Sequence, residues 1–179
     1  MGVFIARGET FRNWTAIAVD AAGDVYASVT GVDIFKSTGG GVFTALGEGA
    51  RAYRGLAVAP NGDVYASVQV GDIYKQTGGA GSFAALGETA RAWRNMTVAP
   101  NGDVYCAVAS GDIYVQTAGA GAFNALGQTA RAWFGLAAAP NGDIYASVTG
   151  GDIYLQTGGT GNFVALGETS RNWFGMGAD

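Results

Sequence analysis

The chain has 179 residues, of which 49% are hydrophobic and 13% charged, so it has the size and composition of one globular domain and not of a disordered chain. Its formal net charge is −4, and it contains no histidine. Without a basic run, nucleic-acid binding is not expected, and without histidine the usual catalytic bases and metal ligands are missing.

The start of the chain lacks the basic lead and long apolar stretch of a signal peptide. No segment reaches the roughly 18 apolar residues that span a bilayer. We therefore expect synthesis in a cytoplasm and no membrane insertion, while the final location is left open. Cys106 is the single cysteine, so no intrachain disulfide is expected, and nothing in the sequence calls for a cofactor.

Internal repeats dominate the sequence. The motif Gly-Asp-Val/Ile-Tyr recurs at Asp24, Asp63, Asp103 and Asp143, which are separated by 39, 40 and 40 residues on subtraction. The array predicts a single repeat domain over 1–179. Its divisions are full repeats at 14–52, 53–92, 93–132 and 133–172, an extra N-terminal strand at 2–7 and an extra C-terminal segment at 173–179.

Each repeat divides into four short strands. In the third repeat they are expected at 96–99, 103–108, 111–117 and 122–126, with an Asn-Gly turn after the first strand. A two-residue loop after the second strand would place Tyr105 opposite Tyr114. The same rule gives three further aromatic pairs: Tyr26 with Phe35, Tyr65 with Tyr74, and Tyr145 with Tyr154.

Four antiparallel strands in about 40 residues are the size of one propeller blade. The sequence therefore predicts an all-β fold, a small β-propeller of four full blades with partial repeat elements at both termini. An open β-solenoid is the alternative. Since unpaired terminal strands expose sheet edges, we expect the two terminal elements to meet as a fifth partial blade or to pair with another subunit in a homo-oligomer.

The segment AVAPNGDVYASVQVGDIYKQT (57–77) resembles the blades of tachylectin- and tectonin-type lectin propellers. Its Gly-Asp-Ile-Tyr-Lys-Gln-Thr-Gly-Gly repeats are also similar to repeats in virion or tail-associated proteins of tailed phages. These resemblances imply a propeller fold, glycan or cell-surface binding, and a place on a phage particle.

The acidic residues follow the repeats, and twelve of the fourteen occupy three repeat positions. Aspartate beside glycine typically caps a turn through the backbone. An enzyme site is normally asymmetric, whereas these carboxylates are copied in each repeat, so we expect that the chain is not an enzyme. We also expect no metal site, because no Asp-x-Asp-x-Asp calcium loop is present.

An Arg-x-Trp/Tyr element supplies the candidate ligand-binding residues. They are Trp14, Arg51, Tyr53, Arg91, Trp93, Arg131, Trp133, Arg171 and Trp173. In one interpretation the Trp ring stacks on a sugar while Arg binds its hydroxyls. In the other, Trp packs between blades and Arg bonds loop carbonyls or a turn aspartate. Specificity is expected where the repeats differ. These places are the turns after the second strand (Thr30-Gly31, Gln69-Val70, Ala109-Ser110 and Thr149-Gly150) and the residues after the aromatic position (Thr15, Arg54, Arg94, Phe134 and Phe174).

Two functions follow from these features. The first is a non-catalytic, multivalent binding module, lectin-like, that recognises glycans or a cell surface from a phage particle or tail. The alternative is a purely structural virion or scaffold subunit that binds neighbouring proteins.

Overall fold

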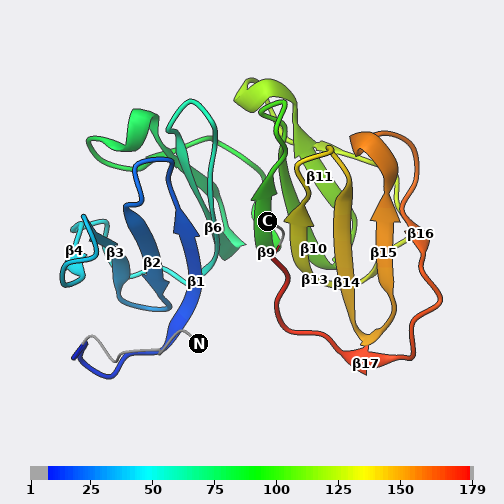
Figure 1. Ribbon diagram of the computed structural model, residues 1–179, viewed down its shortest axis with the longest axis horizontal. Coiled ribbons are helices and arrows are strands. Elements are labelled where there is room, and N and C mark those ends of the chain that lie inside the picture. The colour runs from blue at the N-terminus through cyan, green and yellow to red at the C-terminus, as the bar shows by residue number, and fades with distance from the viewer. Residues whose placement is uncertain (1–7, 178–179) are drawn as a thin grey trace, which may run out of the picture.

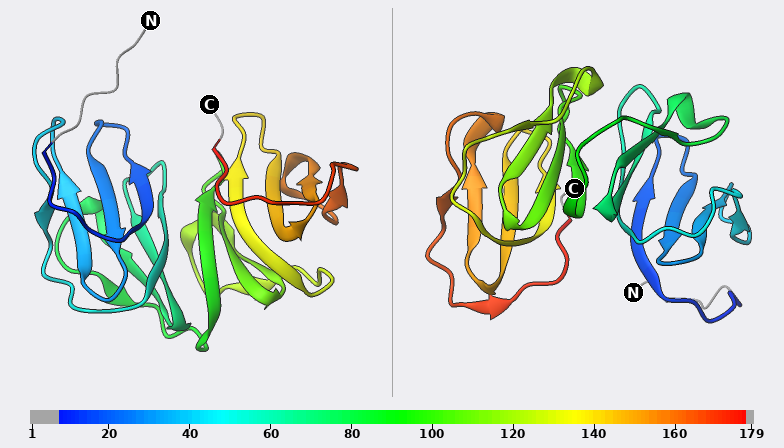
Figure 2. Two further views of the ribbon diagram at one scale, coloured as in Figure 1. Left: turned by 90° about the horizontal axis from the view of Figure 1, so that it is seen from below. Right: turned by 180° about the vertical axis from the view of Figure 1, so that it is seen from behind.

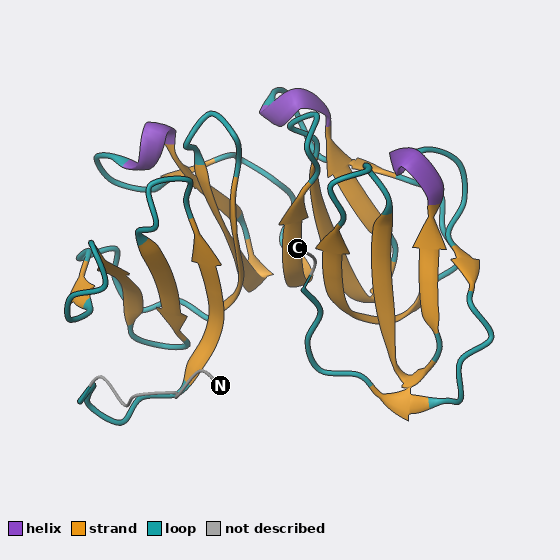
Figure 3. Ribbon diagram, in the orientation of Figure 1, coloured by secondary structure: helices purple, strands orange, loops and turns teal. Residues whose placement is uncertain are grey.

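The computed structural model describes residues 8–177 and contains four similar units of four strands each (Figure 1). The expected all-β class is confirmed, since the only helical pieces in this part of the chain are three short 3-10 turns (Figure 3). Unit 1 contains β1 (Trp14–Val19), β2 (Val25–Val29), β3 (Asp33–Ser37) and β4 (Thr44–Ala45). Unit 2 contains β5 (Tyr53–Val58), β6 (Val64–Gly71), β7 (Ile73–Gln76) and β8 (Ala84–Ala85).

The second half of the chain repeats this order. Unit 3 contains β9 (Arg91–Val98), β10 (Val104–Gly111), β11 (Ile113–Gln116) and β12 (Asn124–Ala125). Unit 4 contains β13 (Arg131–Ala138), β14 (Ile144–Gly151), β15 (Ile153–Gln156) and β16 (Val164–Ala165), and β17 (Arg171–Asn172) follows it. Consecutive strands of a unit pair antiparallel, as the hairpin signals predict.

The predicted aromatic pairs across the second hairpin are wrong in all four units. In unit 3, Tyr105 lies opposite Val115, and Tyr114 lies opposite Cys106. The loop has three residues, not two, because Ser110 adopts a left-handed φ of 56° and the Val108 N–H donates to the Asp112 carbonyl at 3.0 Å. A slip of one residue moves every side chain of a strand to the other face of the sheet. The same slip separates the other expected pairs: Tyr26 from Phe35, Tyr65 from Tyr74, and Tyr145 from Tyr154.

The slip gives the two tyrosines different neighbours. Tyr105 is 1% exposed and faces the following unit, where its hydroxyl donates to the Gly159 carbonyl at 3.2 Å. Tyr26 and Tyr65 make the same bond to Gly79 and Gly119. Tyr114 lies on the other face of the sheet, against Trp93.

The hydrophobic core lies between neighbouring units. Tyr65 and Ile73 of unit 2 pack with Trp93, Met96 and Cys106 of unit 3 in one buried cluster. Equivalent clusters join unit 1 to unit 2 and unit 3 to unit 4. The units therefore stabilise one another face to face, as stacked repeats do.

The four units follow a curve that does not close. Their first strands, β1, β5, β9 and β13, lie beside one another in that order and line the inside of the curve (Figure 2). Backbone pairing joins β6 to β9, β10 to β13 and β14 to β17, while unit 1 forms a separate four-stranded sheet. No sheet is closed within the described residues.

The two predicted terminal elements have different outcomes. The N-terminal strand expected at 2–7 lies outside the described residues. Of the C-terminal segment expected at 173–179, residues 173–177 are described and run along the inside of the curve beside unit 4 (Figure 1). Met176 approaches Gly135 of β13 there, so this segment occupies the position that the first strand of a next unit would take.

Candidate functional site

The aromatic members of the Arg-x-Trp/Tyr element lie at the unit junctions. Trp93 and Trp133 are 0% and 2% exposed, and Tyr53 is 1% exposed. Trp93 packs edge-on against Tyr114 of its own unit, with ring centres 5.2 Å apart. No ring face of these three side chains is open to a stacked sugar, whereas Trp14 at the start of the array is 38% exposed.

The arginines lie over aromatic rings. The guanidinium carbon of Arg51 is 4.4 Å from the ring centre of Tyr74, and Arg91 and Arg131 lie 4.6 and 4.7 Å from Tyr114 and Tyr154. Such cation–π contacts contribute roughly 0.5–2 kcal/mol, depending on burial. Arg171 and Trp173 form a similar pair at 5.8 Å in the exposed last segment. The structure thus places Tyr53, Trp93 and Trp133 at three separate junctions and leaves Trp14 and Trp173 outside them. It does not bring the candidate residues together, and the contacts at the junctions support the packing interpretation. Ligand binding by these residues stays a prediction.

The repeated aspartates hold turns through backbone bonds. Asp72 accepts N–H groups from Ile73, Gly87 and Glu88 at 2.7–2.9 Å. Asp63 lies 2.6 Å from Lys75 and accepts the Gly78 N–H at 2.8 Å. Burial raises the pKa of Asp63, but the bonds from Lys75 and Gly78 outweigh it, so the pKa lies below its ordinary value. Among the described residues, no three metal-ligand side chains gather in one place.

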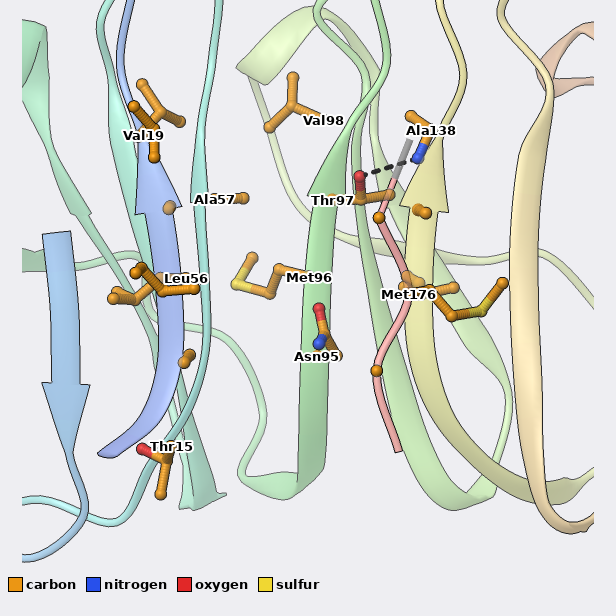
Figure 4. A pocket seen from close by; sticks show the side chains of 18 of the residues that line it. Thr15, Val19, Leu56, Ala57, Asn95, Met96, Thr97, Val98, Ala138 and Met176 are labelled. Atoms are coloured by element: carbon orange, nitrogen blue, oxygen red, sulfur yellow. Dashed lines mark hydrogen bonds between the residues drawn. The ribbon is translucent and has the colours of Figure 1, made fainter. Parts of the chain in front are cut away.

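A pocket on the inside of the curve is a concave feature that the sequence did not indicate. It has a volume of about 500 Å³ and is lined by the first strands of all four units and by residues 174–177. Figure 4 shows Leu56, Met96 and Met176 beside the polar side chains Asn95 and Thr97. None of the lining residues is titratable. We call this feature the axial pocket.

Arg54 and Arg94 do not line the axial pocket themselves, but they occupy the repeat position that Thr15 and Phe174 contribute to its lining. Arg54 Nε donates to Gln69 Oε1 at 2.7 Å, and the guanidinium carbon of Arg94 is 6.0 Å from the ring centre of Phe134. Arg94 Nε is buried without a hydrogen-bond partner. Burial, and then the charge of Arg54, lower the pKa of Arg94.

These two arginines lack a carboxylate. The three ion pairs within residues 8–177 involve Arg12, Lys36 and Lys75. Arg54 and Arg94 belong to the positions that vary after the aromatic residue, so the sequence marks them as distinct. It does not show that they lie beside a pocket, because that depends on how the units curve.

No protein-family model and no curated protein sequence matches the chain. Among solved structures, it is similar to virginiamycin B lyase from Staphylococcus aureus, with a TM-score of 0.73 and 15% identity over 92% of this chain and 59% of that one. It is also similar to YCF48 from Cyanidioschyzon merolae, with a TM-score of 0.67 and 12% identity over 90% of this chain and 58% of that one.

The computationally designed protein Ika8 is a third similar structure, with a TM-score of 0.69 and 19% identity over 90% of this chain and 51% of that one. The chain therefore spans less than two thirds of each of these proteins. At such identities the likeness establishes the fold alone, which is a propeller-type repeat fold. This agrees with the fold that the lectin-propeller resemblance implies.

The expectation that the chain is not an enzyme is wrong in its reasoning. Virginiamycin B lyase is an enzyme with the same fold. Repeated structural carboxylates and a symmetric array therefore do not exclude catalysis, because a propeller can carry one asymmetric site among similar blades.

The described chain also contains no helix with the length and apolarity of a membrane span.

Proposed function

We propose that the chain is a protein-binding module whose axial pocket holds an extended segment of a partner protein. The pocket itself carries this proposal. Its walls combine partly exposed apolar side chains, such as Val98 and Met176, with the uncharged polar groups of Asn95 and Thr97. More of the exposed lining is polar than apolar, so hydrogen bonds to these groups would hold an extended segment and apolar contacts would add to them. A solved structure of this fold, YCF48 bound to a D1 peptide, supports the proposal.

The arginines at the end of the axial pocket suggest the chemistry of that segment. Arg54 and Arg94 are partly buried and unpaired with carboxylates, and the net charge of the protein is −4. A carboxylate from the partner would pair with this cationic end, and a guanidinium in a partly buried site forms strong, directional bonds to such a group. The preferred segment therefore carries an acidic side chain or a C-terminal carboxylate at one end.

A library of short peptides, selected on the wild-type protein, provides the test. Asn95→Trp fills the axial pocket and is expected to weaken the selected peptides by about tenfold or more, which corresponds to about 1.4 kcal/mol. Ala84→Trp on the exposed outer strand β8 is the matched control and is expected to leave affinity unchanged. Arg94→Gln is expected to weaken acidic peptides more than neutral ones. Equal affinities of the wild type and Asn95→Trp would exclude the pocket.

Glycan binding is the second candidate, and one feature favours it. A separate pocket of about 400 Å³ opens on the exposed face of unit 1 and is lined by Glu9, Trp14 and Phe43, among other residues. An exposed indole beside a carboxylate suits a sugar, whose apolar face stacks on the ring. A glycan array tests this: binding that Trp14→Ala abolishes and Trp93→Ala preserves in folded protein supports it, and an array without signal rejects it. A place on a phage particle, which the repeat resemblance implies, stays a prediction.

A further inference from the structure

The exposed face of unit 1 is the face that every later unit buries. Ile17 is 67% exposed, while its repeat equivalents Leu56, Met96 and Leu136 are 3–4% exposed. Trp14 is 38% exposed, against 0% for Trp93 at the same repeat position. In units 2 to 4 these side chains pack on the preceding unit. Unit 1 has no such neighbour in the described chain, so this apolar face meets solvent.

Unit 4 has a complementary uncovered face, which is the face that units 1 to 3 pack against the next unit. Tyr26, Tyr65 and Tyr105 are 0–1% exposed, and their hydroxyls donate to glycine carbonyls of the next unit. Tyr145 at the same position is only partly buried, and no next unit lies beyond it in the described chain. Ile153 is likewise partly buried, whereas Ile34, Ile73 and Ile113 are 0% exposed. The two open faces therefore match the two halves of an interface that the chain forms three times internally.

We propose that a second copy of this chain covers these faces head to tail, with unit 4 of one copy packed on unit 1 of the other. The interface would continue the internal ones: Tyr145 and Ile153 from one copy meet Trp14, Ile17 and Phe43 from the other. Such a contact joins two different surfaces, so it is heterologous and extends until a ring closes. The similar structure Ika8 is about twice as long as this chain, which covers 51% of it.

The C-terminal segment occupies part of the unit 4 surface on which the second copy would pack. Arg171-Asn172-Trp173 repeats the Arg12-Asn13-Trp14 sequence that leads into β1, and Trp173 Nε1 donates to the Gly151 carbonyl at 3.1 Å. In the assembly, β1 of the second copy takes the place of residues 173–177. Most of these residues are exposed and, apart from the Trp173 bond, pack against unit 4 with few side chains. The second copy therefore competes with this segment for the same surface of unit 4. A substitution that weakens the packing of Trp173 on unit 4 favours assembly.

The experiment measures the mass of the full 179-residue protein by light scattering over a range of concentrations. The expected result is a mass of at least twice the 18.1 kDa chain, rising with concentration. Ile17→Asp is expected to give monomers, because a charge on this face prevents burial. Val70→Asp is the matched control: Val70 is 74% exposed in a turn of unit 2, and its variant is expected to assemble like the wild type. Trp173→Ala is expected to assemble at lower concentration.

A mixing experiment distinguishes the head-to-tail arrangement from any other. Ile17→Asp keeps an intact unit 4 face, and Tyr145→Asp keeps an intact unit 1 face. Each variant alone is expected to be monomeric, and an equal mixture is expected to form a heterodimer through the one intact contact. Thermal melts of both variants check that they fold. A wild type that stays monomeric up to about 1 mM, the weak end of specific affinities, overturns the proposal. So does a mixture that does not associate, or a monomer whose Trp14 face binds an immobilised glycan.

Discussion

The strongest prediction compares the same substitution at two copies of one repeat position. Trp93→Ala removes an indole that is 0% exposed and that touches Tyr114 and Phe123, with ring centres 5.2 and 6.2 Å away. Replacing a buried Trp by Ala destabilises a protein by about 3–5 kcal/mol. For a chain of this size, each kcal/mol lowers the melting temperature by about 2–4 °C, so the expected loss is about 6–20 °C.

Trp14→Ala is the matched comparison. Trp14 is 38% exposed and touches Phe35 and Phe43, so part of its surface is already in water. Its removal is expected to destabilise dilute, monomeric protein by about 2 kcal/mol, in proportion to the smaller buried surface. Urea unfolding followed by circular dichroism measures both. Equal losses at the two positions, or a Trp93→Ala loss below about 1 kcal/mol, would refute the assignment of Trp to the unit junctions.

Three further predictions concern single positions. Gly55→Ala would bring a Cβ to 2.7 Å from the Arg94 carbonyl, and this clash is expected to destabilise the protein by about 1–3 kcal/mol. Gly175→Ala is the control: its Cβ would meet nothing within 4 Å, so it creates no clash, and comparative melts are expected to show a clearly smaller loss of stability. Burial raises the pKa of the Cys106 thiol, so iodoacetamide is expected to label it only in denaturant, and rapid native labelling would contradict its burial. Because the pKa of Asp63 lies below its ordinary 3.8, its ion pair with Lys75 stabilises the fold above that pH and fades as pH falls through the folded value. The stability difference between wild type and Lys75→Leu is thus expected to be steady near neutral pH and to shrink in acid, and a difference that grows in acid has the wrong sign for this pair.

Much of the fold can be predicted from the sequence because local signals recur in each repeat. The Pro-Asn-Gly turn forms as expected: Gly102 has a φ of 88°, and the Asp103 N–H donates to Asn101 Oδ1 at 3.1 Å. The turn function of the repeated aspartates follows from the same short-range chemistry. Four repeats with the same signals define the four strands of each unit without knowledge of the curve.

The register of the second hairpin could not be obtained in this way. Its three-residue loop requires left-handed backbone at Val70 and Ser110, with φ of 57° and 56°, in residues that rarely adopt it. The neighbouring unit favours this conformation, because Ala109 and Gly111 pair with Ala132 and Arg131 of β13. A tertiary contact thus sets a turn that local sequence predicts differently.

The candidate site, too, is only partly predictable from local sequence. The sequence identifies the Arg-x-Trp/Tyr pairs, but it does not determine whether the Trp ring faces a neighbouring unit or a ligand. The axial pocket depends on how four units curve, which no single repeat encodes. The variation at Arg54, Arg94 and Phe134 is the one sequence signal that points toward it.

Hydrogen exchange on the protein with a peptide selected from the library tests the central claim most directly, because it locates the bound segment. If the axial pocket holds it, the amides of β1 and β9 become more protected on binding, while those of the outer strands β8 and β12 do not change. Protection confined to the connectors around Arg91 and Arg131, or to the outer strands, would place the ligand elsewhere and contradict the account.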